Sequence, residues 1–66
     1  MHLFHFESTI NMNILVVEDD QFKYSKIAEI LERVFLGSQI NHHDNVSSAI
    51  LFLKVNTPEL IVLDMS

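Results

Sequence analysis

Carboxylates follow two strongly apolar runs of this 66-residue chain. Glu18, Asp19 and Asp20 come directly after residues 14–17, and Asp64 comes directly after a second run. Carboxylates gathered at one place repel one another and favour a bound cation, and a set of oxygen ligands suits Mg²⁺ first. A carboxylate beside such an ion can also accept a phosphoryl group, because the ion offsets charge on the incoming oxygens. The chemistry indicated is therefore magnesium binding and phosphoryl transfer.

The two runs, residues 14–17 and 60–63, are continuous and aliphatic, which is typical of strands buried on both faces of a parallel sheet. The carboxyl ends of neighbouring parallel strands lie at one edge of a sheet, where α/β proteins bind ligands. In a flavodoxin-like strand order these two strands are neighbours. We therefore expect the acids that follow them to converge.

Two helices and a weaker strand complete the expected fold. Residues 21–36 and 46–55 carry apolar side chains every three or four positions, which predicts helices, and Gly37 lies where the first would end. Residues 39–42 form a weaker strand, and Pro58 ends the second helix region. The order β-α-β-α-β predicts an α/β fold, a partial flavodoxin-like doubly wound parallel sheet that is truncated relative to a whole domain.

Composition narrows the function classes. The chain has no cysteine, which excludes disulfides and thiolate metal sites and fits a cytoplasmic protein. Its net charge of −5 argues against binding to nucleic acid or anionic lipid. No apolar run approaches the ~20 residues of a membrane-spanning helix. We expect neither nucleic acid nor a membrane as a partner.

Residues 1–11 differ from the remainder. They lack the basic start and unbroken apolar stretch of a signal peptide, because His5 and Glu7 interrupt the run. We expect residues 1–11 to be a disordered leader or upstream extension, and residues 12–66 to be the folded unit.

At its acidic motifs the sequence resembles the receiver domain of two-component response regulators. Residues 14–20 (ILVVEDD) are similar to that family's first strand and acidic pair. Residues 58–66 (PELIVLDMS) are similar to its third strand and phosphoacceptor, and the spacing between the motifs fits the family. The resemblance covers residues 12–66, the N-terminal half of such a domain.

The resemblance implies a role for each acidic position. Asp64 would take a phosphoryl group from a sensor histidine kinase or a phosphotransfer protein. Asp19, Asp64 and the main-chain carbonyl of Ser66 would hold Mg²⁺ weakly, and Glu18 would act through a bound water. The chain would be a phosphoacceptor module in a phosphorelay and not an enzyme, with no catalytic residues of its own.

Two features of an intact receiver are not found in these 66 residues. Such domains continue through a fourth strand ending in Ser or Thr and a fifth ending in Lys, whereas Lys23, Lys26 and Lys54 lie on predicted helices. We therefore expect poor or no labelling by small phosphodonors and no complete switch. Residues 60–63 would also form an exposed strand edge, so the chain is expected to be molten or to self-associate there.

Other interpretations of the same residues stay open. Asp19 and Asp20 could serve only as helix caps. A glutamate after the first strand and Asp-x-Ser after the third are distantly similar to the metal-binding Toprim fold, although that fold has a glycine where Asp19 stands and an aspartate where Ser66 stands. A third possibility is an interaction element that pairs through residues 60–63. His42 and His43 are expected to be surface histidines and not a zinc site, since neighbours on a strand face opposite sides and cannot easily share a metal.

Overall fold

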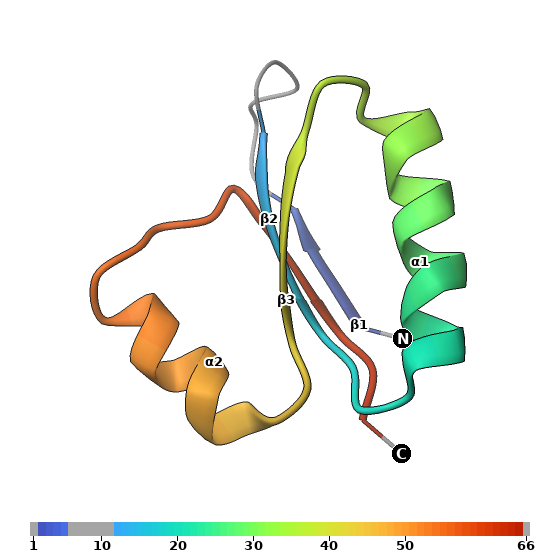
Figure 1. Ribbon diagram of the computed structural model, residues 1–66. Coiled ribbons are helices and arrows are strands. Elements are labelled where there is room, and N and C mark those ends of the chain that lie inside the picture. Colours follow the sequence, from blue (N-terminus) through green and yellow to red (C-terminus); the bar gives the residue numbers. More distant parts are fainter. Residues whose placement is uncertain (1, 6–11, 66) are drawn as a thin grey trace.

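The computed structural model describes residues 2–5, for which it gives the backbone, and residues 12–65. Within these residues a single sheet has the strand order β1-β4-β2-β3. Strands β4, β2 and β3 are parallel, and helices α1 and α2 lie on opposite sides of the sheet (Figure 1). The elements in chain order are β1 (His2–His5), β2 (Asn13–Val17), α1 (Gln21–Val34), β3 (Gln39–His43), α2 (Val46–Leu53) and β4 (Leu60–Leu63). The predicted α/β fold with a flavodoxin-like parallel sheet is confirmed for β2, β3 and β4.

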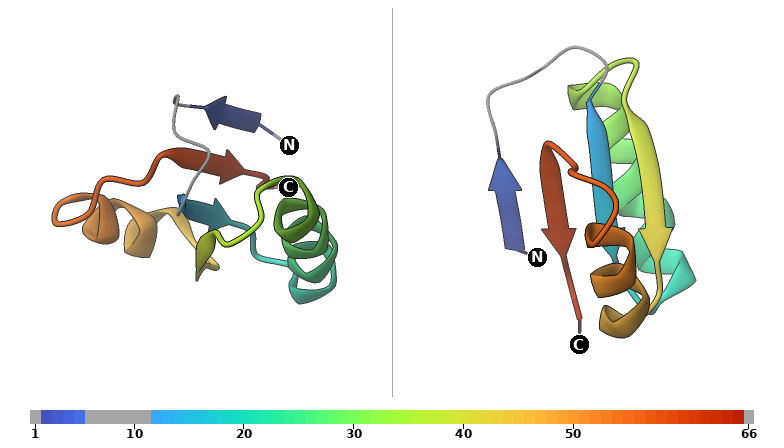
Figure 2. Two further views of the ribbon diagram at one scale, coloured as in Figure 1. Left: turned by 90° about the horizontal axis from the view of Figure 1, so that it is seen from above. Right: turned by 90° about the vertical axis from the view of Figure 1, so that its left-hand side faces the viewer.

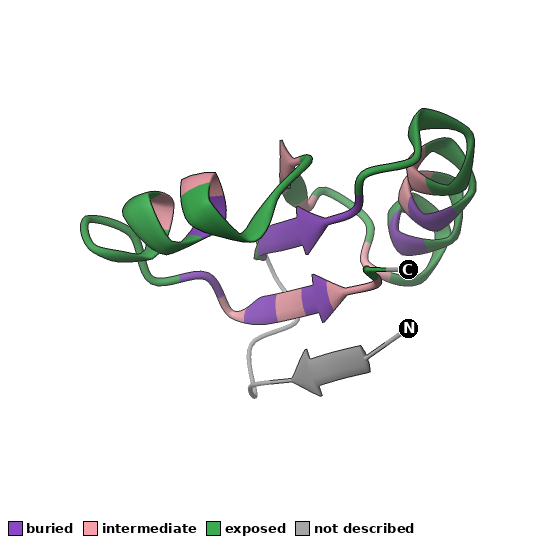
Figure 3. Cartoon of the chain, turned by 90° about the horizontal axis from the view of Figure 1, so that it is seen from below, coloured by how far each residue is buried: buried purple, intermediate pink, exposed green. Residues whose placement is uncertain are grey.

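The core divides into two clusters because side chains alternate along β2. Ile14 and Val16 pack with the buried side chains of α1, Ile27 and Leu31. Leu15 and Val17 face the other way and pack with Ala49 of α2. Figure 3 shows the buried residues concentrated in β2, in alternate positions of β4 and on the sheet-facing side of α1. A strand buried on both faces explains why β2 is continuously aliphatic.

Both helices begin at side-chain caps. Asp20 Oδ1 accepts hydrogen bonds from the backbone N–H groups of Phe22 (2.8 Å) and Lys23 (3.1 Å), which starts α1. Asn45 starts α2 in the same way through Ser48 N–H (2.8 Å). Each helix ends two residues before its predicted boundary, and Gly37 follows α1 with a φ of 79°, a conformation that glycine adopts without strain.

Strand β1 corrects two sequence-based expectations. His2–His5 pair antiparallel with β4, in a register that joins His2 to Leu63 and His5 to Leu60 (Figure 2). The prediction of a disordered leader is therefore wrong for residues 2–5, and the remaining leader residues lie outside the described ones. The expectation that residues 60–63 form an exposed edge is also wrong, because β4 lies between β1 and β2. The physical reason is that unpaired N–H and C=O groups of β4 are satisfied by an available extended segment.

Strand β3 is the edge strand on the other side of the sheet. Its side chains are mostly polar and only partly buried, which explains the weak strand signal of its sequence. Neither helix of the described residues combines the length and apolarity needed to cross a membrane.

Candidate functional site

The carboxyl ends of β2 and β4 lie side by side. In the parallel register Val17 is opposite Leu63, and the backbone N–H of Asp64 donates a 3.0 Å hydrogen bond to the carbonyl oxygen of Val17. The backbone of Asp64 is thus fixed next to the residue that precedes Glu18. This bond is the contact that brings the two acidic motifs to one edge of the sheet.

Glu18 is fully buried, unlike the two acids that follow it. Its Oε2 accepts a 2.9 Å hydrogen bond from the backbone N–H of Asp20. In the described part of the chain, no group forms a hydrogen bond with its Oε1. A buried carboxylate oxygen without a partner costs free energy unless water or a cation satisfies it. The Oε1 atom therefore marks a position where a water molecule or an ion would be stabilised.

Asp19 and Asp20 have different surroundings. Both are exposed, but the Asp20 carboxylate is engaged as the cap of α1. Asp19 lies on the rim of a hollow of about 390 Å³ at the same end of the sheet. The hollow is lined by Asp19, Gln21, His42, His43, Asp44 and Ser48. Asp19 is thus the acid of residues 18–20 that is open to a ligand from solvent.

The acids fit Mg²⁺ in donor chemistry, although they do not form a ready-made cage. Among the described residues, no three His, Asp or Glu side chains gather as a metal site. Mg²⁺ does not need such a set, since it commonly binds one or two carboxylates and keeps several waters. The unpartnered Oε1 of Glu18 suits a water of that kind. Asp64 is half-buried beside them, and Ser66 lies outside the described residues.

The two histidines of β3 face opposite helices and are half-buried, not simply exposed. The His42 ring stacks on the Tyr24 ring of α1 at a centroid distance of 3.7 Å. His43 Nδ1 shares a 2.6 Å hydrogen bond with Ser48 Oγ on α2, and its ring lies 5.1 Å from that of Phe52. Strand alternation predicts the opposite directions, but nothing in the sequence indicates that the rings would contact side chains of both helices.

The phenol of Tyr24 has a pKa above its ordinary value. Partial burial raises the pKa of its phenol, and the negative charge of Glu32 acts in the same direction. Tyr24 is therefore neutral across the physiological pH range, so its contact with His42 is one between an uncharged phenol and the imidazole.

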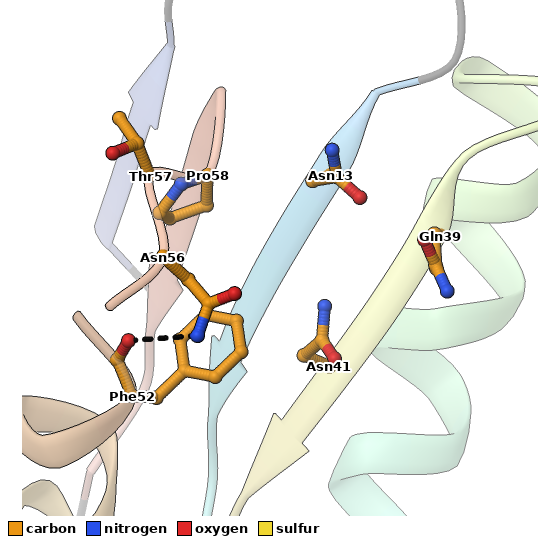
Figure 4. A pocket seen from close by; sticks show the side chains of 7 residues that line it. All are labelled: Asn13, Gln39, Asn41, Phe52, Asn56, Thr57 and Pro58. Atoms are coloured by element: carbon orange, nitrogen blue, oxygen red, sulfur yellow. Dashed lines mark hydrogen bonds between the residues drawn. The ribbon is translucent and has the colours of Figure 1, made fainter. Parts of the chain in front are cut away.

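A second hollow, of about 220 Å³, lies at the opposite end of the sheet (Figure 4). Asn13 and Gln39, the first residues of β2 and β3, contribute to it, and Asn56 Nδ2 donates a 3.0 Å hydrogen bond to the carbonyl oxygen of Phe52 at its wall. The lining comprises Asn13, Gln39, Asn41, Phe52, Asn56, Thr57 and Pro58, none of which is titratable. The lining thus offers amide and hydroxyl groups for hydrogen bonding but no group for acid–base or metal chemistry.

One comparison with known proteins finds a relative. The chain is 48% identical over 54 residues to the Detocs response regulatory protein DtcB of Vibrio alginolyticus, an alignment that covers 80% of this chain and 36% of that protein. The chain thus spans about a third of the length of the relative it matches. No family model matches. No solved structure matches either.

The matched relative and the fold both agree with the resemblance described for the sequence. A parallel α/β sheet with acids after two adjacent strands is the arrangement that the receiver resemblance implies, and the matched relative is named a response regulatory protein. The resemblance to a response-regulator receiver is thereby confirmed.

Proposed function

We propose that the chain acts in cytoplasmic signal transduction as a phosphoacceptor module, with Asp64 as the acceptor. The observation that carries the proposal is the hydrogen bond from Asp64 N–H to the Val17 carbonyl oxygen, which holds Asp64 beside the buried Glu18. The response-regulator name of the relative supports a signalling role in general. It favours a module that is phosphorylated by a partner over an enzyme.

The proposed reaction is transfer of a phosphoryl group to the side chain of Asp64. A carboxylate oxygen of Asp64 attacks phosphorus in the donor, a phosphohistidine of a sensor kinase or phosphotransfer protein. The new O–P bond gives an aspartyl phosphate, while the P–N bond breaks and the imidazole leaves with its electron pair and takes up a proton. This chain supplies the nucleophile and the surrounding acids.

We propose Mg²⁺ as the cofactor. Asp19 and Asp64 would be its carboxylate ligands, together with the main-chain carbonyl of Ser66, and Glu18 would accept a hydrogen bond from a bound water. Bound there, the ion would offset negative charge on the phosphoryl oxygens. The exposed position of Asp19 and the unpartnered Oε1 of Glu18 support these assignments.

The phosphoacceptor assignment predicts slow, incomplete phosphorylation at Asp64. The 66-residue chain is incubated with acetyl phosphate and Mg²⁺, reduced with borohydride to trap the acyl phosphate, and mapped by mass spectrometry. The rate is low because the lysine and hydroxyl of an intact receiver are not in these 66 residues. Losing one such preorganised donor typically costs about 10²–10³ in rate.

Two substitutions control the labelling experiment. Asp64→Asn is expected to remove the label, whereas Asp44→Asn, at an exposed aspartate that lines the same hollow as Asp19, is expected to keep it. A label that persists in Asp64→Asn, or that is lost equally in Asp44→Asn, contradicts the assignment. Rapid, complete labelling contradicts the argument about the rate.

The metal assignment predicts that Mg²⁺ shifts the amide resonances of residues 18–20 and 64 in a titration. Asp19→Ala is expected to weaken binding at least ~10-fold, since even residues that contact a metal only through its ligands typically contribute 10–100-fold. Asp44→Ala is the matched control and should leave the affinity unchanged. Amide resonances that do not shift with Mg²⁺, or that shift equally in Asp19→Ala and Asp44→Ala, would count against a magnesium site at this edge of the sheet.

A further inference from the structure

Four residues at the acidic end of the sheet are linked in a closed circuit. The backbone N–H of Tyr24 donates a 2.9 Å hydrogen bond to the carbonyl oxygen of Asp20, and Asp20 N–H donates a 2.9 Å bond to Glu18 Oε2. His42 Nε2 lies 2.9 Å from the carbonyl oxygen of Glu18. The Tyr24 and His42 rings stack with an interplanar angle of 4°, which closes the circuit. We call Glu18, Asp20, Tyr24 and His42 the contact ring.

The contact ring joins the end of β2, the first turn of α1 and strand β3 at the loop that carries the acids. A carbonyl oxygen only accepts, so His42 Nε2 must carry the hydrogen it donates to Glu18. The backbone N–H of Glu18 donates to the carbonyl oxygen of His43 at 3.0 Å. Strand β3 therefore holds Glu18 at both its N–H and its C=O. Tyr24 then ties the first turn of α1 to the same strand.

We propose that Tyr24 and His42 are positioning residues for the acidic site. Tyr24 and His42 fix the backbone of residues 18–20. In this way they set the direction of the buried Glu18 Oε1 and the position of the exposed Asp19 next to it. The inference rests on the proposed function, because it assigns these residues to the magnesium site proposed there. His43 is on the same strand but faces α2, outside the contact ring, and so provides a matched comparison.

The test compares the same substitution at adjacent histidines. His42→Phe keeps a flat ring that can stack on Tyr24 but removes the donor to Glu18, and His43→Phe makes the equivalent change on the other face. Mg²⁺ affinity is measured by amide shifts, and stability by urea denaturation. His42→Phe is expected to weaken Mg²⁺ binding about 10-fold, as loss of a residue that orients metal ligands typically does. His43→Phe is expected to lower stability without changing the affinity of the folded chain.

Two further variants separate the hydrogen bond from the stack. His42→Gln retains a side-chain N–H at the position of Nε2 and is expected to restore part of the affinity lost in His42→Phe. Tyr24→Phe keeps the ring and should bind Mg²⁺ as the unaltered chain does, whereas Tyr24→Ala should bind it less tightly. Equal Mg²⁺ affinities for folded His42→Phe and His43→Phe would overturn the proposal.

Spectra without metal distinguish failure of this inference from failure of the proposed function. If the unaltered chain does not respond to Mg²⁺, the magnesium assignment fails. The contact ring still requires His42→Phe to shift the amide resonances of Asp19 and Asp20 and His43→Phe to leave them in place. Unshifted Asp19 and Asp20 resonances in His42→Phe would show that the contact ring does not position the loop.

Discussion

Removal of residues 1–11 is expected to convert the chain into one that associates through β4. In the structure β1 pairs with β4 along Leu60–Leu63. Without β1, this aliphatic strand presents unpaired N–H and C=O groups, and its sequence contains no lysine or proline to block pairing with a second copy. The measurement is light scattering after size-exclusion chromatography at several concentrations, with the full 66-residue chain monomeric and the shortened chain oligomeric.

A single substitution provides a milder version of the same experiment. Phe4 is opposite Ile61, and Phe4→Pro removes a backbone N–H and restricts φ in β1. It is expected to increase association, whereas Phe4→Leu keeps the N–H and should remain monomeric. If the shortened chain and Phe4→Pro both stay monomeric at high concentration, β1 does not protect β4. Association of the unaltered chain to the same extent would lead to the same conclusion.

Leu60→Ala is expected to remove a large part of the chain's free energy of unfolding. Leu60 is fully buried and belongs to the cluster on the α1 side of the sheet. Truncation of a buried leucine to alanine typically lowers the free energy of unfolding by about 2–5 kcal/mol. At about 0.05–0.15 kcal/mol per residue, a chain of this length is stable by roughly 3–10 kcal/mol. The loss is therefore a large fraction of the free energy of unfolding and equals all of it at the low end of this range.

Urea denaturation followed by circular dichroism measures this loss. Leu51→Ala is the matched control, because Leu51 is 63% exposed and its truncation should change the stability by no more than about 0.5 kcal/mol. Similar midpoints for the two alanine variants would mean that Leu60 does not lie in a packed core.

The sequence predicts the parallel part of the fold because its signals are local. The aliphatic runs of β2 and β4 and the apolar spacing of α1 each indicate one element without reference to any other. Strand β1 carries no comparable signal, since it is short, begins and ends in histidine, and has its partner at the far end of the chain. Its place in the sheet depends on the backbone N–H and C=O groups along one edge of β4, which would lack partners without β1. That edge is known only once the strand order of the sheet is known.

The sequence likewise predicts where the candidate site lies but not how each of its side chains is oriented. Acids that follow adjacent parallel strands meet at one edge of the sheet, so their neighbourhood follows from topology. Which of the three consecutive acids turns inward does not follow from topology, because Glu18, Asp19 and Asp20 all carry carboxylates and the path of the backbone decides which of them is buried. The burial of Glu18 and the capping by Asp20 are set by that path, and so is the contact of His42 with Glu18.

The antiparallel pairing of β1 has a consequence for the order in which the chain assembles. Its register joins His5 to Leu60 and His2 to Leu63, so the ladder closes a loop that contains almost the whole sequence. Such distant contacts form late, because loop-closure entropy opposes them until other structure has shortened the effective separation. During synthesis residues 2–5 leave the ribosome before residues 60–63, so β1 has no partner strand until β4 has emerged. Of the strands described, β1 is therefore made first and joins the sheet last.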